Sequence, residues 1–328
     1  MRATVLGSFP GTDMRATLRW VLGELPDLAP VPELPARGPG AQMIGRATPL
    51  LEGLACDLQP GGWRLTDASG VDHRRARSLL RQDLDDLEEL AQGWSGTLKV
   101  SVAGPLTLAA QLERPRGDKA LADHGARAEI AASLAEGVGN LLADLRRRLP
   151  DVTWMVQLDE PMLPAVMAGA VPTASGFSRH RAVHAPEVAA AMDALAISVG
   201  DAPVVVHCCA SGLDLALLGR TRIAGVSLPS SLLGSRDLDA LGPWLEDGRQ
   251  LLLGVHPTWP VDTPRSVDDV VGTALGVLRP LDLDPELVRG AVTLTPDCGL
   301  AGWTHQPAVT CVRTLVRASD LVAEHLGR

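Results

Sequence analysis

The residues best suited to chemistry stand together in the stretch VVVHCC, residues 204–209. Successive side chains of a strand point to opposite faces, so His207 and Cys209 share one face and Cys208 lies on the other. With one cysteine from another strand end, Cys298, they form a His/Cys/Cys set of the kind that binds Zn²⁺. Three protein ligands leave one coordination position open, as in catalytic zinc sites, where a bound thiol loses its proton and becomes a nucleophile.

Packing is the alternative role for these thiols, because free cysteine is among the most buried residue types. His-x-Cys is a short pattern, and its spacing alone does not decide between metal binding and packing. Cys56 and Cys311 have no partner pattern in the sequence, so for them packing is favoured.

The composition of the chain indicates the class of protein and the compartment in which these residues act. The chain has 328 residues, of which 46% are hydrophobic, and a formal net charge of −9, which argues against a nucleic-acid or anionic membrane surface. No apolar segment is long enough to cross a bilayer, and the first ten residues lack the apolar core of a secretory signal. We therefore expect a cytoplasmic protein in which the five cysteines stay reduced, as free thiols or metal ligands.

Short β-rich runs alternate with longer helical patterns along the chain. The strand-like runs are residues 3–10, 98–105, 153–161, 203–210, 223–231, 251–258 and 291–298. The clearest helical patterns, with apolar residues recurring at three and four, are residues 74–92, 127–149, 186–199 and 306–326. Apolar strands that alternate with helices predict a parallel sheet covered on both faces. No change of composition marks a linker, so we expect a single domain spanning residues 1–328.

Seven such runs are one short of a (β/α)8 barrel, and we place the missing strand in residues 41–67. An open doubly wound sheet is disfavoured, because GSFPGTD after the first run carries a proline where the helix of a phosphate-binding turn would begin. In a barrel the carboxyl ends of all strands meet on one face, where active sites are built. Cys298 can therefore meet His207, beside other polar strand-end residues such as Ser8, Asp159 and His256.

Six motifs together resemble the catalytic half of cobalamin-independent methionine synthase. They are LGSFPGTDMR at 6–15, GPLTL at 104–108, QLDEPML at 157–163, HCC at 207–209, GVH at 254–256 and TPDCGL at 295–300, in the family's order and over nearly the whole chain. The second, amino-terminal barrel of the long enzymes is not seen in this sequence. The resemblance implies a zinc-bearing (β/α)8 barrel that passes a methyl group to the sulfur of homocysteine, giving methionine.

The resemblance also implies roles for single residues. His207, Cys209 and Cys298 fall on zinc-ligand positions, and Ser8 falls on a position that holds the amino acid part of homocysteine. For Ser8 the alternative is a turn residue ahead of Pro10.

Asp159 falls on another family position that holds the amino acid part of homocysteine. His256 falls on the position of the family's proton-relay histidine. We therefore expect both residues to be catalytic. A methyl-bearing nitrogen leaves readily only when protonated, which is work for a histidine or a carboxylic acid. Adjacent strand residues point to opposite sides, so Asp159 is expected to face the substrate ammonium, with Glu160 fixing the neighbouring loop of the substrate site. Each residue also has a structural alternative. His256 could be a half-buried histidine hydrogen-bonded to the backbone, and Asp159 and Glu160 could each take part in a salt bridge at the strand end.

One position departs from the family pattern. A family glutamate that ligates zinc corresponds to Pro229 in VSLPSS, and proline cannot ligate. Zn²⁺ with two thiolates and a neutral histidine is about neutral, whereas a carboxylate would make the site about −1. The family's folate-contacting region is not recognisable in residues 50–97. The methyl donor is therefore left open between methyl-tetrahydrofolate and a methylated corrinoid protein, which would be a protein partner; the oligomeric state is not indicated.

Two other functions are kept beside thiol methyl transfer. A lyase of the uroporphyrinogen decarboxylase type shares the barrel and needs arginines for an acidic tetrapyrrole, for which Arg37 and Arg46 are available. A barrel that binds zinc or substrate without turnover is the other alternative, and Pro229 is the main reason to consider it. Metal content separates methyl transfer from the lyase, and single-turnover methyl transfer separates it from the inactive barrel.

Overall fold

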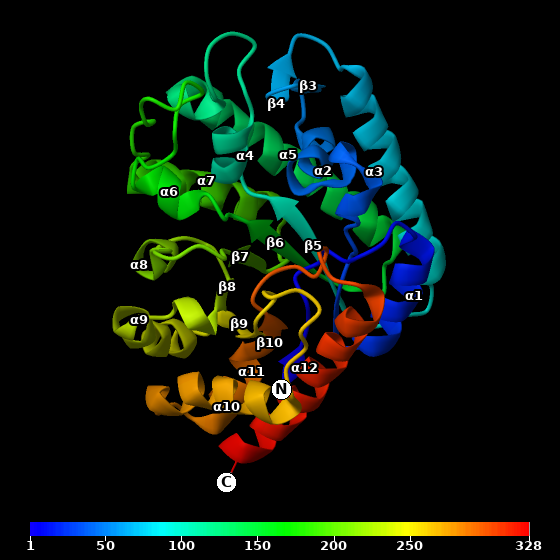
Figure 1. Ribbon diagram of the computed structural model, residues 1–328, viewed down its shortest axis with the longest axis vertical. Helices are drawn as coiled ribbons and strands as arrows, with labels where there is room; N and C mark the ends of the chain where they lie inside the picture. The colour runs from blue at the N-terminus through cyan, green and yellow to red at the C-terminus, as the bar shows by residue number, and fades with distance from the viewer. Residues whose placement is uncertain (328) are drawn as a thin grey trace.

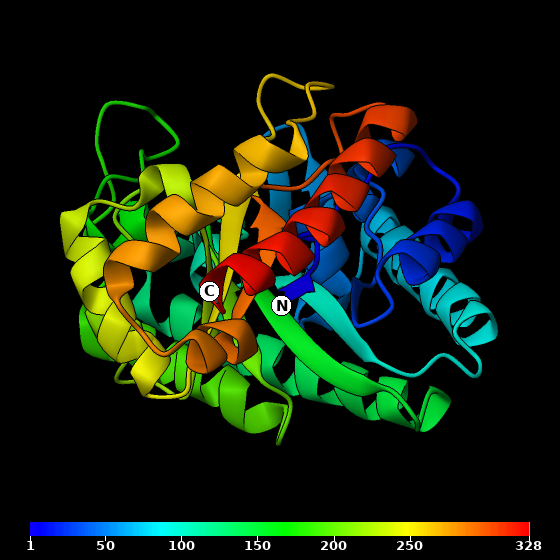
Figure 2. The same ribbon diagram turned by 90° about the horizontal axis from the view of Figure 1, so that it is seen from below.

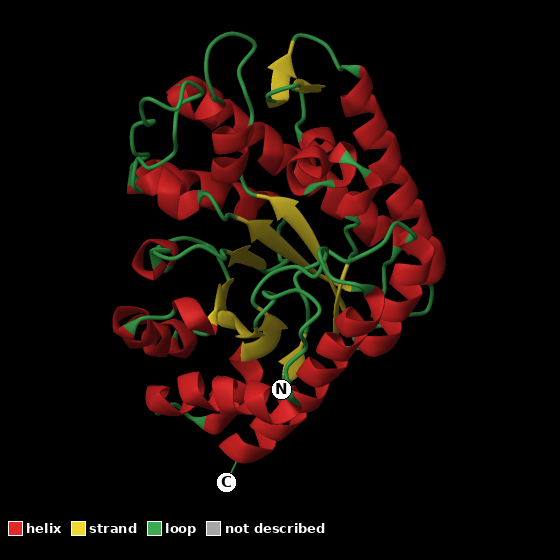
Figure 3. Ribbon diagram, viewed as in Figure 1, coloured by secondary structure: helices red, strands yellow, loops and turns green. Residues whose placement is uncertain are grey.

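The computed structural model describes residues 1–327 and contains an eight-stranded parallel sheet rolled into a barrel. Neighbouring strands follow the order β1-β10-β9-β8-β7-β6-β5-β2. The strands stand at the centre of a ring of helices (Figure 1, Figure 3). Their bounds are β1 Arg2–Ala3, β2 Leu28–Pro30, β5 Thr97–Ala103, β6 Thr153–Asp159, β7 Val204–His207, β8 Gly225–Pro229, β9 Gln250–His256 and β10 Val292–Pro296. The predicted (β/α)8 barrel is confirmed.

The barrel closes between its first two strands through a short parallel bridge. Ser8 pairs with Glu33 just beyond the ends of β1 and β2. The amide of Glu33 donates to the carbonyl of Gly7 at 2.8 Å, and the amide of Phe9 donates to the carbonyl of Glu33 at 2.9 Å. Barrel closure therefore brings Ser8 and Glu33 side by side.

The placement of the eighth strand in residues 41–67 is wrong. That strand is β2, which has only three residues and lies in the proline-rich stretch PDLAPVPELP, so it shows no strand periodicity. Residues 41–67 instead form the short helices α2 (Met43–Ala47) and η3 (Thr48–Leu50) and an antiparallel hairpin. The hairpin strands, β3 (Ala55–Gln59) and β4 (Gly62–Thr66), form a separate sheet.

The four predicted helices are all present, as α3 (Val71–Leu90), α5 (His124–Arg148), α7 (Ala185–Ser198) and α12 (His305–Leu326). α12 packs against α10 (Val267–Leu278) along one side of the barrel (Figure 2). The remaining α-helices are α1 Met14–Glu24, α4 Pro105–Gln111, α6 Leu163–Met167, α8 Leu215–Leu218, α9 Ser235–Glu246, α10 Val267–Leu278 and α11 Pro285–Ala291. No helix in residues 1–327 is long and apolar enough to span a membrane.

The barrel interior changes from apolar to polar along the strands. Four fully buried side chains, Leu28, Met155, Val205 and Leu252, form a small cluster of their own. Two residues further along β6 and β7, on the same face of each strand, stand Gln157 and His207. The polar face of the interior therefore begins above this apolar layer and opens toward the carboxyl ends of the strands. The loop between α6 (Leu163–Met167) and α7 and the loop after β9 project from one side of the barrel (Figure 2).

Candidate active site

A cavity of about 280 Å³ lies at the carboxyl ends of the strands. It is bounded by strand ends and by the segments that follow β1, β2 and β10, as expected for the active-site face of a barrel. Its polar lining consists of Ser8, Glu33, Gln157, Asp159, His207, Cys209 and Cys298.

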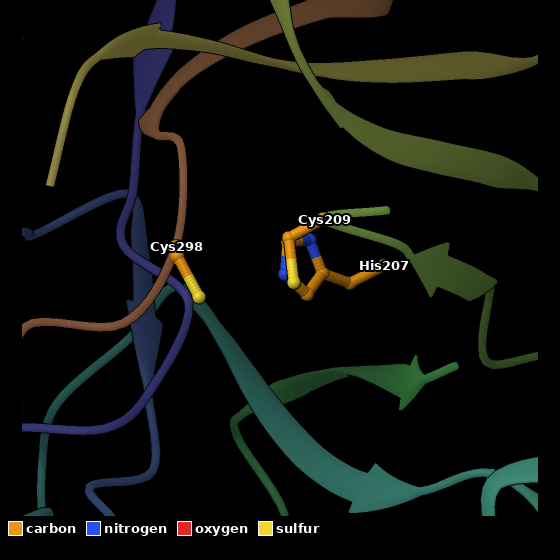
Figure 4. A group of neighbouring side chains, drawn as sticks. All are labelled: His207, Cys209 and Cys298. Atoms are coloured by element: carbon orange, nitrogen blue, oxygen red, sulfur yellow. The ribbon is translucent and has the colours of Figure 1, made fainter. Parts of the chain in front are cut away.

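The three predicted metal ligands meet in this cavity. One ligand atom each of His207, Cys209 and Cys298 lies within 4.8 Å of the other two. His207 and Cys209 come from the end of β7, and Cys298 approaches from the segment after β10 with its sulfur directed at the pair (Figure 4). Cys208 is turned away into the hydrophobic core, where its thiol donates to the carbonyl of Ala210 at 3.5 Å.

The donor set fits a zinc ion. Zn–S bonds of about 2.3 Å and Zn–N bonds of about 2.0 Å place tetrahedral ligands about 3.5–3.8 Å apart, so small side-chain adjustments bring the cluster to that spacing. Nδ1 of His207 lies 3.1 Å from the Ser227 hydroxyl, which leaves Nε2 for a metal. Such an outer hydrogen bond fixes the orientation of a ligating imidazole. Ser227 is a supporting residue that the sequence motifs did not indicate.

The two thiols of the cluster affect each other's protonation. Their interaction lowers the pKa of Cys209 below its ordinary value and raises the pKa of Cys298 to about 12. Both thiols must lose their protons to act as zinc ligands, so zinc binding would release protons from the cluster.

Pro229 is the last residue of β8 and lies two positions after Ser227, so both face the same side of the strand. Across the sheet it pairs with Gly254, and a Cβ on that glycine would lie 2.9 Å from Oδ1 of Asp297. This oxygen is buried without a hydrogen-bond partner, and burial raises the pKa of Asp297 to about 6. Asp297 is thus a half-buried residue beside Cys298 with one buried, unpaired carboxyl oxygen, and the sequence motifs did not assign it a role.

Ser8 and Asp159 line the cavity, and Glu33 lies beside them. Sequence reasoning missed Glu33 because it follows β2, the strand that showed no pattern. The feature that reveals the place of Glu33 is its pairing with Ser8, and this pairing forms only when the barrel closes. A side chain at Gly299 would overlap the Ser8 hydroxyl, so this glycine makes room for Ser8 next to Cys298.

Burial sets the charge state of the two cavity carboxylates. It raises the pKa of Glu33 to about 7, even though Arg46, 3.4 Å away, acts in the opposite direction. Burial also raises the pKa of Asp159, while His207, a hydrogen bond from Gln157 and the charge of Lys99 lower it. A cation entering the cavity would favour the ionised form of both carboxylates.

Glu160 does not line the cavity. Its carboxylate accepts the backbone amides of Leu106 and Thr107 at 2.9 and 2.8 Å, and the Thr107 hydroxyl at 2.7 Å. Burial nevertheless raises its pKa to about 7. Gly104 leaves the space that this carboxylate fills, so Glu160 ties the start of α4 to the end of β6.

His256 is also not among the cavity-lining side chains. Its ring is fully buried, with Nδ1 2.9 Å from the carbonyl of Pro257 and Nε2 accepting the amide of Arg265 at 2.9 Å. Burial lowers the pKa of the ring, so it is neutral at pH 7, donates from Nδ1 and accepts at Nε2. Its edge packs against Trp303. In this arrangement His256 holds the loop after β9.

The two arginines that could have bound an acidic tetrapyrrole instead form ion pairs with a carboxylate inside the protein. Arg37 and Arg46 both donate to Asp83 of α3, at 2.7 and 2.8 Å. Asp83 is almost completely buried, so these pairs are part of the packing between α3 and the barrel. This removes the observation on which the lyase alternative depended.

Comparisons with known proteins agree with this geometry. The family model described as "Cobalamin-independent synthase, Catalytic domain" matches residues 96–321. Among solved structures, the B12-independent methionine synthase from Shewanella sp. W3-18-1, in complex with selenomethionine, has a TM-score of 0.64 at 14% identity. That match covers 99% of this chain and 98% of the other, and it is a similarity of fold. A comparison with curated proteins finds no match. Because the family model matches more than half of the chain, the protein belongs to the cobalamin-independent methionine synthase family of methyltransferases.

Proposed function

We propose that this protein transfers a methyl group to the thiol of homocysteine, with Zn²⁺ as cofactor. The observation that carries the proposal is that a His/Cys/Cys cluster and two carboxylates line the same cavity. The solved structure of the Shewanella methionine synthase is a complex with selenomethionine, an analogue of methionine. A biosynthetic role of this kind fits a cytoplasmic location.

The cluster forms the thiol end of the site. His207, Cys209 and Cys298 would hold Zn²⁺, which lowers the pKa of a bound thiol so that its sulfur is nucleophilic at neutral pH. In this protein the Ser227 hydroxyl keeps the His207 ring in place at 3.1 Å. With Pro229 at the end of β8, no glutamate from that strand joins the three ligands.

The carboxylates form the amino acid end. Glu33 and Asp159 are the groups that would bind the substrate ammonium, with Ser8 beside Glu33 as a further polar partner. An ammonium ion paired with a buried carboxylate gives a charge-assisted hydrogen bond, which is stronger than a neutral one. Glu160 supports this end indirectly, because it fixes the loop between β5 and α4.

The methyl group moves from nitrogen or cobalt of the donor to sulfur, and the proton of the thiol is lost on binding. With a methylated amine as donor, the breaking carbon–nitrogen bond leaves an electron pair that must take up a proton. We assign that proton transfer to His256, whereas Asp159 takes part in the reaction by holding the substrate ammonium. The neutral ring of His256 is bonded to the loop of residues 257–265, so proton transfer by His256 requires this loop to open.

Metal content and single-turnover chemistry test the function. We expect about one zinc per chain in protein purified without chelator, and no retained zinc in a Cys298→Ser variant. Zinc-loaded protein mixed with homocysteine and either methyl-tetrahydrofolate or methylcobalamin should form methionine with one of the two donors. Bound zinc without methionine from either donor would support the inactive barrel, and protein that never takes up zinc would exclude both.

A further inference from the structure

Lys99 is a buried cation that the proposed chemistry does not use. Only two of the 30 basic residues of the chain are lysines, and this one is fully buried on β5 inside the barrel. A lysine is rarely buried without a partner, because removing its charge from water is costly. Lys99 forms no ion pair within residues 1–327, so its position needs another explanation.

The ammonium group of Lys99 has two hydrogen-bond partners, both neutral. It donates to the carbonyl of Leu6 at 3.2 Å and to Oε1 of Gln157. Burial lowers the pKa of Lys99 to about 8, while the charges of Asp159 and Glu33 act in the opposite direction. The group is therefore cationic at neutral pH, and its charge is balanced by carboxylates that it does not touch.

Lys99 determines which way the amide of Gln157 points. An ammonium group can only donate, so the side-chain oxygen of Gln157 must face Lys99. The amide nitrogen then faces the other way and donates to Oδ1 of Asp159 at 2.7 Å and to the Leu6 carbonyl at 3.1 Å. Without Lys99 the amide could turn over and present its oxygen to Asp159, which would oppose the ionised carboxylate.

We propose that Lys99 is a positioning residue that acts through Gln157 to keep the carboxylate of Asp159 directed at the ligand ammonium. The inference rests on the proposed function, because it concerns the amino acid end of the same cavity. Gln157 lines that cavity beside Asp159, whereas Lys99 is not in its lining and cannot contact the ligand. Its effect must therefore appear in the recognition of the ammonium group and leave the thiol end unchanged.

Two variants and two ligands test the inference by titration calorimetry on zinc-loaded protein. Lys99→Met removes the donor, and Gln157→Glu keeps Lys99 paired but cannot donate to Asp159. Homocysteine should bind each variant about 10- to 100-fold more weakly than the parent, the usual effect of losing one charged hydrogen bond. The ligand 4-mercaptobutanoate, which is homocysteine without its amino group, should bind all three proteins within about threefold.

Lys119→Met is the matched control, because it makes the same substitution at the other lysine, which lies outside the cavity. It should bind both thiols as the parent does. Equal weakening of both thiols in Lys99→Met and Gln157→Glu would show a general structural role and overturn the inference, as would homocysteine binding of either variant at parental strength. If the zinc-loaded parent binds neither thiol, the proposed function fails, and the inference fails with it.

Discussion

We expect the charge state of Glu33 to make methionine binding depend on pH near neutrality. Its pKa is raised to about 7 by burial, and the carboxylate is the form that pairs with a ligand ammonium. At pH 6 about one tenth of a group with this pKa is ionised, and at pH 8 about nine tenths. When only one form binds, apparent affinity follows its population, so affinity should rise about tenfold between these two pH values.

The sign follows from the direction of the shift. Affinity is lost as pH falls through about 7, instead of near 4.5 as for an ordinary glutamate. The groups that face Glu33 are Arg46, which opposes the rise, and Asp159, which adds to it, with Lys99 and Asp83 as smaller influences. Asp159 also has a raised pKa, so its ionisation changes affinity in the same direction.

The assay is calorimetric titration of the protein with methionine at pH 6, 7 and 8. Methionine is the better probe than homocysteine because its thioether has no proton to lose in this range. Glu33→Gln should bind more weakly at pH 8 and show a flatter profile, whereas Glu246→Gln, at an exposed site on α9, should behave as the parent does. A parent profile that does not rise with pH, or a Glu33→Gln profile with the parental slope, would refute the reasoning.

Three further variants test other parts of the site. In Pro229→Glu, the new carboxylate should add an oxygen ligand to the zinc ion, which X-ray absorption would detect. It should also weaken thiol binding, because it competes with the thiol for the open coordination position. A zinc ion without a new oxygen ligand would show that residue 229 does not face the metal. His256→Asn should lower the single-turnover rate by roughly 10² to 10⁴ and leave zinc content unchanged, whereas an unchanged rate would restrict His256 to holding its loop. Gly299→Ala should displace Ser8 and weaken methionine binding by roughly tenfold, and tight binding would show that the Ser8 hydroxyl is not used.

The His/Cys/Cys cluster could be predicted from sequence because it depends on two simple rules. Alternation along a strand places His207 and Cys209 together, and convergence of strand ends in a barrel brings Cys298 to them. Both rules need only the approximate position of each strand, and long apolar runs gave those positions. The closeness of the three ligand atoms, within 4.8 Å, follows from the same rules.

Glu33 could not be predicted in the same way. Its strand has three residues in a proline-rich segment, so neither periodicity nor length marked it. Its place in the cavity comes from the pairing with Ser8 across the seam of the barrel, a contact between residues far apart in the sequence. Lys99 lay inside a predicted strand run, but its inward direction becomes meaningful only when Gln157 and Leu6 are seen on either side.

Strand-end position also does not tell where a polar side chain points. Asp159, Glu160 and His256 all stand at the carboxyl ends of strands, yet only Asp159 lines the cavity. The Glu160 carboxylate accepts hydrogen bonds from the backbone of α4, and the His256 ring is hydrogen-bonded to the backbone of the loop after β9. These partners belong to loops whose conformations no periodic pattern specifies, so the sequence marks such residues without assigning their contacts.

The arrangement of buried charges favours an amino acid at the carboxylate end. Arg46 and Lys99 oppose the raised pKa values of Glu33 and Asp159, yet neither cation lines the cavity and neither fully offsets the effect of burial. Ionising these carboxylates therefore remains unfavourable until a cation enters this end of the cavity. A ligand ammonium supplies that cation, whereas a thiol without an amino group does not. Selectivity for homocysteine over simpler thiols would thus arise from the burial of Glu33 and Asp159.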